Sequence, residues 1–313
     1  DYAWAIASRG QTYDSTGRYE EALADYNRAI EIAPETSWIL SARGELYRVA
    51  GRYEEALADF DHVIESNPDY AWAIASRGQT YDSTGRYEEA LADYNRAIEI
   101  NPEYVWAITN RGQLHLSMGR PEEALADFDR AIEINPEYVW AIANRGHILR
   151  LEGRYTEALA AFDRAIEIDT ASTYAMTSRG VTYRVLGRYE EALADFDRAL
   201  ALEPDNGWTH YERSVALYAT HHPECQSCVA RTIELCSARN HISDKGNLFL
   251  VHCLMSRWEE ADGYLSILID SNPTRGNLVE LLTVSDTLRQ VVASAEEKIL
   301  SFRHRLETAL REQ

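Results

Sequence analysis

A 16-residue stretch occurs six times in the chain, with small variations, at a fixed interval. This repetition constrains the fold more than any other feature. The stretch GRYEEALADYNRAIEI begins at Gly17. Close copies follow every 34 residues, at Gly51, Gly85, Gly119, Gly153 and Gly187. Residues 1–32 also recur letter for letter at residues 69–100. A constant period of 20 to 50 residues indicates one supersecondary unit stacked in tandem. We therefore predict a solenoid.

Each unit predicts two helices. In the first unit, a helix is expected over about residues 3–15, and Gly17 ends it. The second helix carries Glu20 and Glu21 in its first turn, where the helix dipole favours negative charge. Its apolar residues recur every three or four positions, which is the pattern of one buried face. Pro34 stops this helix, and the pattern restarts.

The residues at fixed places in the unit identify its type. Counted from Ala3 as position 1, they are Gly10, Tyr13, Ala22, Tyr26, Ala29 and Pro34. This pattern resembles the tetratricopeptide repeat family, whose unit is two antiparallel helices with small residues at their crossing. The resemblance implies an all-α, right-handed superhelical solenoid of antiparallel helix pairs. One departure is the family's usual Trp at position 4, which is Ile, Leu or Met here.

The periodicity also sets the expected boundaries. Two degenerate units should follow the regular ones over residues 207–274, and capping or coiled-coil-like helices should fill residues 275–313. We expect six regular units, at residues 3–36, 37–70, 71–104, 105–138, 139–172 and 173–206.

The last segment abandons the repeat but keeps an apolar seam with 4-3-4-3-4 spacing. Such a seam suits an end cap, which solenoids need, or a dimerisation helix, or a junction to a further domain. Ser294 and Glu297 form a possible capping box, so this segment is either one helix or two helices broken near residue 293. The seam consists of Leu288, Val292, Ala295, Ile299, Phe302 and Leu306.

The formal charge of −20 limits the classes of partner that the chain is expected to bind. Residues 207–313 carry 14 acidic and 11 basic side chains, so most of the negative charge lies on the regular units. An acidic array repels phosphate, which argues against nucleic acid and anionic membranes and favours a neutral to basic protein. No apolar run approaches the ~18 residues of a membrane span. The two Lys beside 29 Arg are typical of a GC-rich bacterium.

The first residues, Asp1 and Tyr2, match the pair that ends a unit at Asp69 and Tyr70, and no initiator Met precedes them. We therefore expect the natural protein to continue upstream, with more repeats or an effector domain.

Partner contacts are expected on one face of each first helix. On a helical wheel, positions 2, 6, 9 and 13 lie opposite the core positions 4, 8 and 11. The family resemblance implies that this face lines a concave groove that holds a peptide or a helix. Seven successive units carry an aromatic residue at position 2, and several carry amides mid-groove, which can pair with a peptide backbone. The predicted partner-binding residues are Trp38, Trp72, Gln79, Trp106, Asn110, Gln113, Trp140, Asn144, His147, Arg150, Tyr174 and Arg184.

The position-2 aromatic residues have an alternative, structural role, because each can pack on the preceding unit and fill the space between adjacent repeats. The groove becomes more apolar from His147 onward, which favours docking of an amphipathic helix near the fifth to seventh units. The Lys, Asn and Arg of the family's carboxylate clamp are absent from positions 5 and 9. The arginine at position 7 of each unit is expected to be structural, bonded to acids of the second helix.

The seventh unit holds the only cluster of metal-ligand residue types. Cys225, Cys228, Cys236 and His222 are candidates for zinc, since tetrahedral zinc takes thiolates and imidazoles at such spacings. A redox pair and ordinary packing are the alternatives, and a single CxxC favours packing. Four cysteines in so long a chain imply no disulfide framework and fit a reducing cytoplasm.

We therefore predict a non-enzymatic module, without cofactors, that binds a protein partner. No glycine-rich phosphate loop and no isolated Ser, His and Asp cluster suggests catalysis. One alternative is the sensor array of a larger bacterial signalling protein with an ATPase or protease effector upstream. Another is a self-assembly scaffold, in which residues 275–313 of one molecule lie in the groove of a second.

Overall fold

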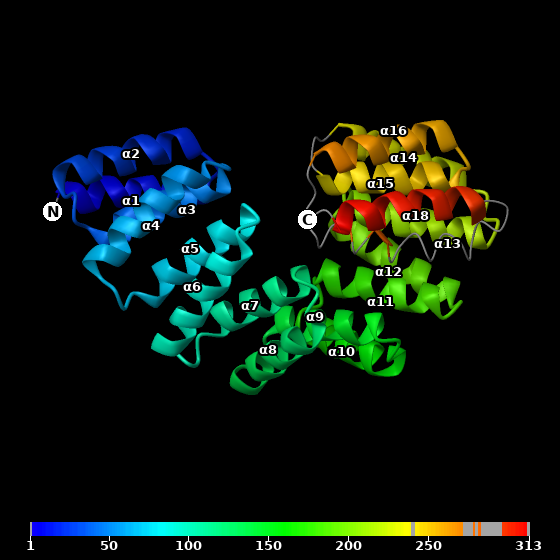
Figure 1. Cartoon of the computed structure of the whole chain (residues 1–313), viewed down its shortest axis with the longest axis horizontal. Coiled ribbons are helices and arrows are strands. Elements are labelled where there is room, and N and C mark those ends of the chain that lie inside the picture. Colours follow the sequence, from blue (N-terminus) through cyan, green and yellow to red (C-terminus); the bar gives the residue numbers. More distant parts are fainter. Residues whose placement is uncertain (1, 239–241, 272–277, 279–280, 283–295, 312–313) are drawn as a thin grey trace. The chain divides into compact units, whose positions relative to one another are not determined.

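The structure is a computed structural model that describes residues 2–238, 242–271, 278, 281–282 and 296–311. Every regular element among them is a helix, seventeen in all, and the described residues contain no strand. The chain divides into two compact units, residues 1–115 and 116–313. The division falls within helix α7 (Val105–Ser117), which is labelled in Figure 1. Each unit is described by itself below.

Unit 1 consists of successive helical hairpins. In each hairpin a first helix packs against the second helix that follows it in the chain. Its helices are α1 (Tyr2–Ser15), α2 (Tyr19–Ile32), α3 (Ser37–Val49), α4 (Tyr53–Ser66), α5 (Ala71–Ser83), α6 (Tyr87–Ile100) and the part of α7 (Val105–Ser117) up to residue 115. The helix pairs predicted from the 34-residue period are confirmed.

Unit 2 continues the same pattern and ends in an additional helix. The two degenerate repeats also form hairpins, α13 with α14 and α15 with α16. The helices are α8 (Pro121–Ile134), α9 (Val139–Leu151), α10 (Tyr155–Ile168), α11 (Thr173–Val185), α12 (Tyr189–Leu202), α13 (Gly207–Ala219), α14 (Cys225–Ser237), α15 (Ile242–Leu254), α16 (Trp258–Asp270) and α18 (Glu296–Arg311).

The turn inside each regular hairpin depends on a left-handed glycine. Gly17 has a φ of 75°, and the N–H of Arg18 donates to the carbonyl of Tyr13 at 2.9 Å. This arrangement satisfies carbonyls at the end of the first helix and reverses the chain. The degenerate repeats keep the turn without glycine, since His221 and Ser256 have φ values of 52° and 56°.

Close approach of the two helices requires a second glycine. A Cβ atom on Gly146 of α9 would stand 2.9 Å from the Phe162 ring of α10. The ring therefore packs closely against the first helix and is fully buried. The same contact joins Gly10 to Tyr26, Gly44 to Phe60, Gly78 to Tyr94 and Gly180 to Phe196.

The arginines at position 7 hold neighbouring hairpins together, as the sequence predicts. The guanidinium of Arg77 on α5 donates to both carboxylate oxygens of Asp93 on α6, each at 2.7 Å. It also donates to Asp61 on α4 at 2.7 Å. Arg77 therefore contacts its own second helix and the preceding one, and Arg179 does the same through Asp195 and Asp163. The same bidentate bond joins Arg9 to Asp25, Arg43 to Asp59 and Arg179 to Asp195.

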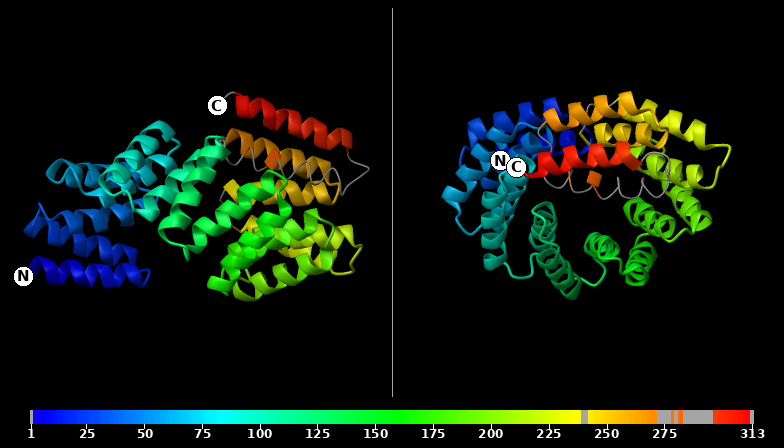
Figure 2. Two further views of the ribbon diagram at one scale, coloured as in Figure 1. Left: turned by 90° about the horizontal axis from the view of Figure 1, so that it is seen from below. Right: turned by 45° about the vertical axis from the view of Figure 1, so that its right-hand side comes forward.

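Helix α18 caps the end of unit 2. Ile299, Phe302 and Leu306 are buried, and α18 packs against α16 (Figure 2). The Phe302 ring meets Phe249 edge-on, with centroids 5.6 Å apart, and Trp258 lies beside it at 6.4 Å. The expected C-terminal helical cap is therefore present. The predicted seam residues Leu288, Val292 and Ala295, and the Ser294 capping box, lie outside the described residues.

Candidate functional site

The first helices of consecutive hairpins form a row within each unit. In unit 1, α3 contacts both α1 and α5, and in unit 2, α11 contacts both α9 and α13. Positions 2, 6, 9 and 13 of these helices, with position 12 at their edge, form the surface that the sequence predicts for partner binding. We call it the first-helix face.

In unit 1 the aromatic residues on this face differ in exposure. Trp38 is 37% exposed. Trp72 is half-buried, because its ring meets Phe60 of α4 edge-on and lies against Tyr70, both with centroids 6.1 Å away. Trp72 therefore packs between adjacent repeats, whereas the Trp38 side chain remains accessible to solvent. Gln79 on the same face is half-buried.

The part of α7 in unit 1 carries three predicted residues. Trp106 is half-buried and lies beside Tyr104, with ring centroids 5.8 Å apart. The Nδ2 atom of Asn110 donates to the backbone carbonyl of Trp106 at 2.7 Å. Gln113 is half-buried. The amide N–H of Asn110 is therefore used by its own helix.

On α9 of unit 2, an exposed tryptophan packs at a tilt against an aromatic ring of the next first helix. Trp140 is 46% exposed, and its ring centroid lies 5.3 Å from that of Tyr174 on α11. Asn144 is buried below them, where its Nδ2 donates to the carbonyl of Trp140 at 2.8 Å and its Oδ1 accepts from the Tyr174 hydroxyl at 3.3 Å. Asn144 therefore holds the aromatic pair in place.

His147 and Arg150 lie one turn further along α9. Burial, together with the positive charge of Arg150, lowers the pKa of His147 to about 3. The imidazole is therefore neutral near pH 7, and its Nδ1 accepts a hydrogen bond from Nη2 of Arg150 at 3.3 Å. Leu151 at the end of the helix is exposed.

The structure buries Arg184, which the sequence analysis assigned to partner contact. Its Nε atom donates to Oε2 of Glu212 on α13 at 2.8 Å, and both side chains are almost inaccessible to solvent. Val181 and Val215 on the same face are also buried in the packing of α11 to α16. The apolar character after His147 therefore reflects the internal core here, and the sequence signal that was missed is Glu212, an acid 28 residues from Arg184.

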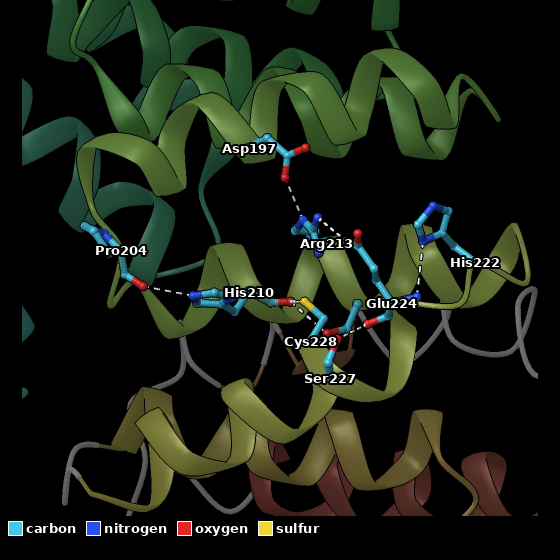
Figure 3. Close-up of polar contacts among 9 residues, drawn as sticks. Asp197, Pro204, His210, Arg213, His222, Glu224, Ser227 and Cys228 are labelled. Carbon is cyan, nitrogen blue, oxygen red and sulfur yellow. Dashed lines mark hydrogen bonds and ion pairs between the residues drawn. The ribbon is translucent and has the colours of Figure 1, made fainter.

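The four zinc candidates do not gather at one point. The Cys228 thiol donates to the carbonyl of His210 at 3.4 Å (Figure 3). The Cys225 thiol approaches the carbonyl of Ser214. His222 Nδ1 accepts the backbone N–H of Glu224. Cys236 is buried near the other end of α14, beside Gly207. In the part of the chain that the structure describes, no three His, Cys, Asp or Glu side chains are grouped to hold a metal ion.

A guanidinium lies at the centre of this region instead. Arg213 donates to Asp197 at 2.7 Å and to Glu224 at 2.9 Å, joining α12, α13 and the start of α14 (Figure 3). This is the position-7 arginine of the seventh repeat, so the polar contacts here belong to the same structural ladder.

Sequence profiles of tetratricopeptide repeats match this chain along more than half of its length. The matched segments are residues 3–35, 37–70, 78–119, 105–138, 128–160 and 173–206. The chain belongs to the tetratricopeptide repeat (TPR) family. The matches reach into each of the six predicted regular units and leave residues 71–77 and 161–172 unmatched. The hairpins α13–α14 and α15–α16 follow the last matched segment in the structure.

Solved structures show the same fold. A TPR protein from Parabacteroides merdae aligns with a TM-score of 0.63 at 21% identity, over 80% of this chain and 98% of its own. PilF of Pseudomonas aeruginosa aligns with a TM-score of 0.56 at 20% identity, over 64% and 92%. A chain of the APC/C hetero-tetramer Cut9–Hcn1 aligns with a TM-score of 0.62 at 16% identity, over 74% of this chain and 48% of its own. At these identities the likeness shows the TPR fold alone.

None of the curated proteins matches the chain. Among the helices that the structure describes, none combines the length and the apolar character needed to cross a membrane.

Proposed function

We propose that this TPR array is a non-enzymatic module that binds a peptide or a helix of a protein partner on its first-helix face. The TPR fold supports a protein-interaction role in general. The exposure of Trp38 and Trp140 on this face is the observation that carries the specific proposal. Tryptophan is among the residues most enriched where binding energy concentrates. Covering a large exposed aromatic ring with a partner's surface lowers the free energy of the complex.

The described contacts favour aromatic recognition over backbone recognition by amides. The amide groups of Asn110 and Asn144 donate to carbonyls of their own helices, so they brace the face. Trp140, packed against Tyr174, then offers an aromatic surface, with Leu151 further along the same helix. A partner with an apolar or aromatic side chain at its centre suits this surface.

The acidic charge favours a neutral to basic partner, because opposite charge speeds encounter and suppresses acidic competitors. The two alternatives are the sensor array of a larger signalling protein and a self-assembly scaffold, and the scaffold would use the same face. The scaffold requires the C-terminal segment to detach from the unit that it caps. In the structure, Ile299, Phe302 and Leu306 of this segment are buried.

The test uses partners captured by the full chain from the source organism and identified by mass spectrometry. Each partner is then purified and titrated against Trp38→Ala/Trp140→Ala and against Ile267→Ala, which removes a similarly exposed apolar side chain from α16. The proposal expects a loss of at least tenfold in affinity for the tryptophan variant alone. Equal affinity for all three proteins would overturn it.

A further inference from the structure

Two cysteines lie one turn apart at the start of α14. Cys225 is the first residue of this helix and Cys228 is the fourth. Residues three positions apart in an α-helix are neighbours on its surface, and the rise and radius of the helix put their Cα atoms about 5 Å apart. Disulfides join Cα atoms that are about 4.4–6.8 Å apart. The backbone of α14 therefore holds the two cysteines within disulfide range.

Both sulfur atoms face the same neighbouring helix. Sγ of Cys228 donates to the backbone carbonyl of His210 at 3.4 Å, and Sγ of Cys225 lies 3.8 Å from the carbonyl oxygen of Ser214. His210 and Ser214 are one turn apart on α13, so the two thiols lie along one strip of its surface. These contacts place the two sulfur atoms on the same side of α14.

The cysteines of this region differ in exposure. Cys225 is half-buried, so its sulfur lies within reach of a small molecule in solution. Cys228 is only 5% exposed, and Cys236 and Cys253 are buried as well. A reaction with a small molecule therefore begins at Cys225, and Cys228 reacts next with whatever Cys225 has bound.

Turning Cys228 toward Cys225 leaves no carbonyl of α13 without a donor. The carbonyl of His210 also accepts a hydrogen bond from the Ser214 hydroxyl at 2.8 Å, and it keeps this bond when the thiol leaves. A thiol is a weak donor, so the bond that is given up is the weaker of the two. Closing a disulfide at the start of α14 therefore costs the α13–α14 hairpin little hydrogen bonding.

The surroundings of Cys225 set the conditions of the reaction. Burial raises the pKa of the Cys225 thiol, and the neighbouring Cys228 adds to the shift. The thiolate is the nucleophile in exchange with a disulfide. Cys225 is therefore mostly protonated at neutral pH, and its reaction proceeds faster in mildly alkaline solution.

We propose that Cys225 and Cys228 form an intrahelical disulfide by exchange with a disulfide of low molecular weight, which makes the start of α14 a site of oxidative modification. The six regular repeats contain no cysteine, so the site belongs to the seventh repeat alone. It does not depend on the proposed function, because α14 is a second helix and carries no part of the first-helix face.

The exchange has two steps. The Cys225 thiolate attacks one sulfur of the external disulfide, forms a mixed disulfide and releases one thiolate. The Cys228 thiolate then attacks the Cys225 sulfur, closes the protein disulfide and releases the second thiolate. Two protein thiols are oxidised, the external disulfide is reduced to two thiols, and the two protons pass from the cysteines to the released thiolates.

The test treats the fully reduced chain with glutathione disulfide at pH 8, then denatures it and alkylates the remaining thiols. Trypsin separates the cysteines, because Cys225 and Cys228 share the peptide of residues 214–231 whereas Cys236 and Cys253 lie in residues 232–239 and 246–257. We expect mass spectrometry to show an internal disulfide in the first peptide, formed at least tenfold faster than Cys236 or Cys253 is modified. Equal rates at all four cysteines, or no disulfide in the first peptide, would overturn the proposal.

Two variants assign the roles, with circular dichroism to compare their helical content with the wild type. Cys228→Ala should stop at the mixed disulfide, with one glutathione on Cys225. Cys225→Ala should leave Cys228 unmodified, because its sulfur is buried. Cys236→Ala is the control and should form the disulfide at the wild-type rate. Modification of Cys228 in the Cys225→Ala variant as fast as in the wild type would contradict the assigned order. The wild-type peptide map needs no variant and tests the disulfide by itself.

Discussion

Arg184 and Glu212 form a buried ion pair between α11 and α13, with the Nε atom of Arg184 2.8 Å from Oε2 of Glu212. The other carboxylate oxygen of Glu212 has no partner in the described residues. Removing one member of a buried pair leaves a charge without compensation, which costs about 3–5 kcal/mol. This pair therefore tests how the sixth and seventh repeats are held together.

We expect Glu212→Ala to destabilise unit 2 by about 3–5 kcal/mol, because the guanidinium of Arg184 is left buried and alone. Arg184→Leu/Glu212→Leu should recover most of this loss, since apolar side chains fill the space without a charge. Chemical denaturation followed by circular dichroism measures both. Arg188→Ala breaks an exposed pair with Glu191 and serves as the control, with a cost below about 1 kcal/mol. A cost for Glu212→Ala as small as that of the control would contradict the account.

The fifth repeat lacks one carboxylate of the arginine ladder, and restoring it should stabilise the chain. Ala161 stands where the other regular repeats have aspartate, so Arg145 keeps Asp129 and its side chain is 32% exposed, against 18% for Arg77. We expect Ala161→Asp to raise the free energy of unfolding by about 0.5–1.5 kcal/mol through a charge-assisted bond to Arg145. Ala160→Asp, which adds the same charge at the neighbouring exposed position, should give no gain. Equal effects of the two changes would show that the added bond does not form.

The turns of the degenerate repeats store strain that glycine would relieve. Ser256 is exposed and has a φ of 56° at the position where regular repeats have glycine. We expect Ser256→Gly to stabilise the α15–α16 hairpin by about 1 kcal/mol, because a side chain disfavours this backbone conformation. Gly153→Ala should destabilise by a similar amount at a φ of 75°. Thermal unfolding measures both shifts, and a lower melting temperature for Ser256→Gly would contradict the account.

Asp82 should make stability depend on pH in an unusual direction for an aspartate. Its pKa is about 6 in the folded chain and 3.8 ordinarily, so between these values the folded state binds more protons than the unfolded state. Its contribution is therefore lost as pH rises from about 4 to 6. Asp82→Asn should stabilise the chain at pH 7 by about 1–2 kcal/mol, with little effect at pH 4. If the difference in free energy of unfolding between Asp82→Asn and the wild type is the same at pH 4 and pH 7, the carboxylate is fully solvated.

The helices follow from the sequence because each local signal agrees with the period. Gly17 ends a helix through its left-handed backbone, and Gly146 permits the contact with Phe162 at the crossing. The same residue types return every 34 positions, so the prediction for one unit holds for the next. This local consistency is why six units could be placed without the structure.

The candidate site is less predictable, because exposure depends on neighbours that are distant in sequence. The helical wheel places Trp72 and Trp140 alike. Yet the Trp72 ring is packed against Phe60, whereas the Trp140 ring packs beside Tyr174 and stays exposed. It also places Arg184 toward a partner, but Glu212, 28 residues later, takes the guanidinium. A wheel describes one helix and contains no information about the helix packed beside it.

The most direct test of the account is the affinity of an identified, purified partner for the full chain and for the Trp38→Ala/Trp140→Ala variant, measured by isothermal titration calorimetry. Circular dichroism first establishes that the variant retains its helical content. The account predicts at least a tenfold loss of affinity, with Ile267→Ala unchanged from the wild type. An unchanged affinity of the tryptophan variant would contradict the claim that the first-helix face binds the partner.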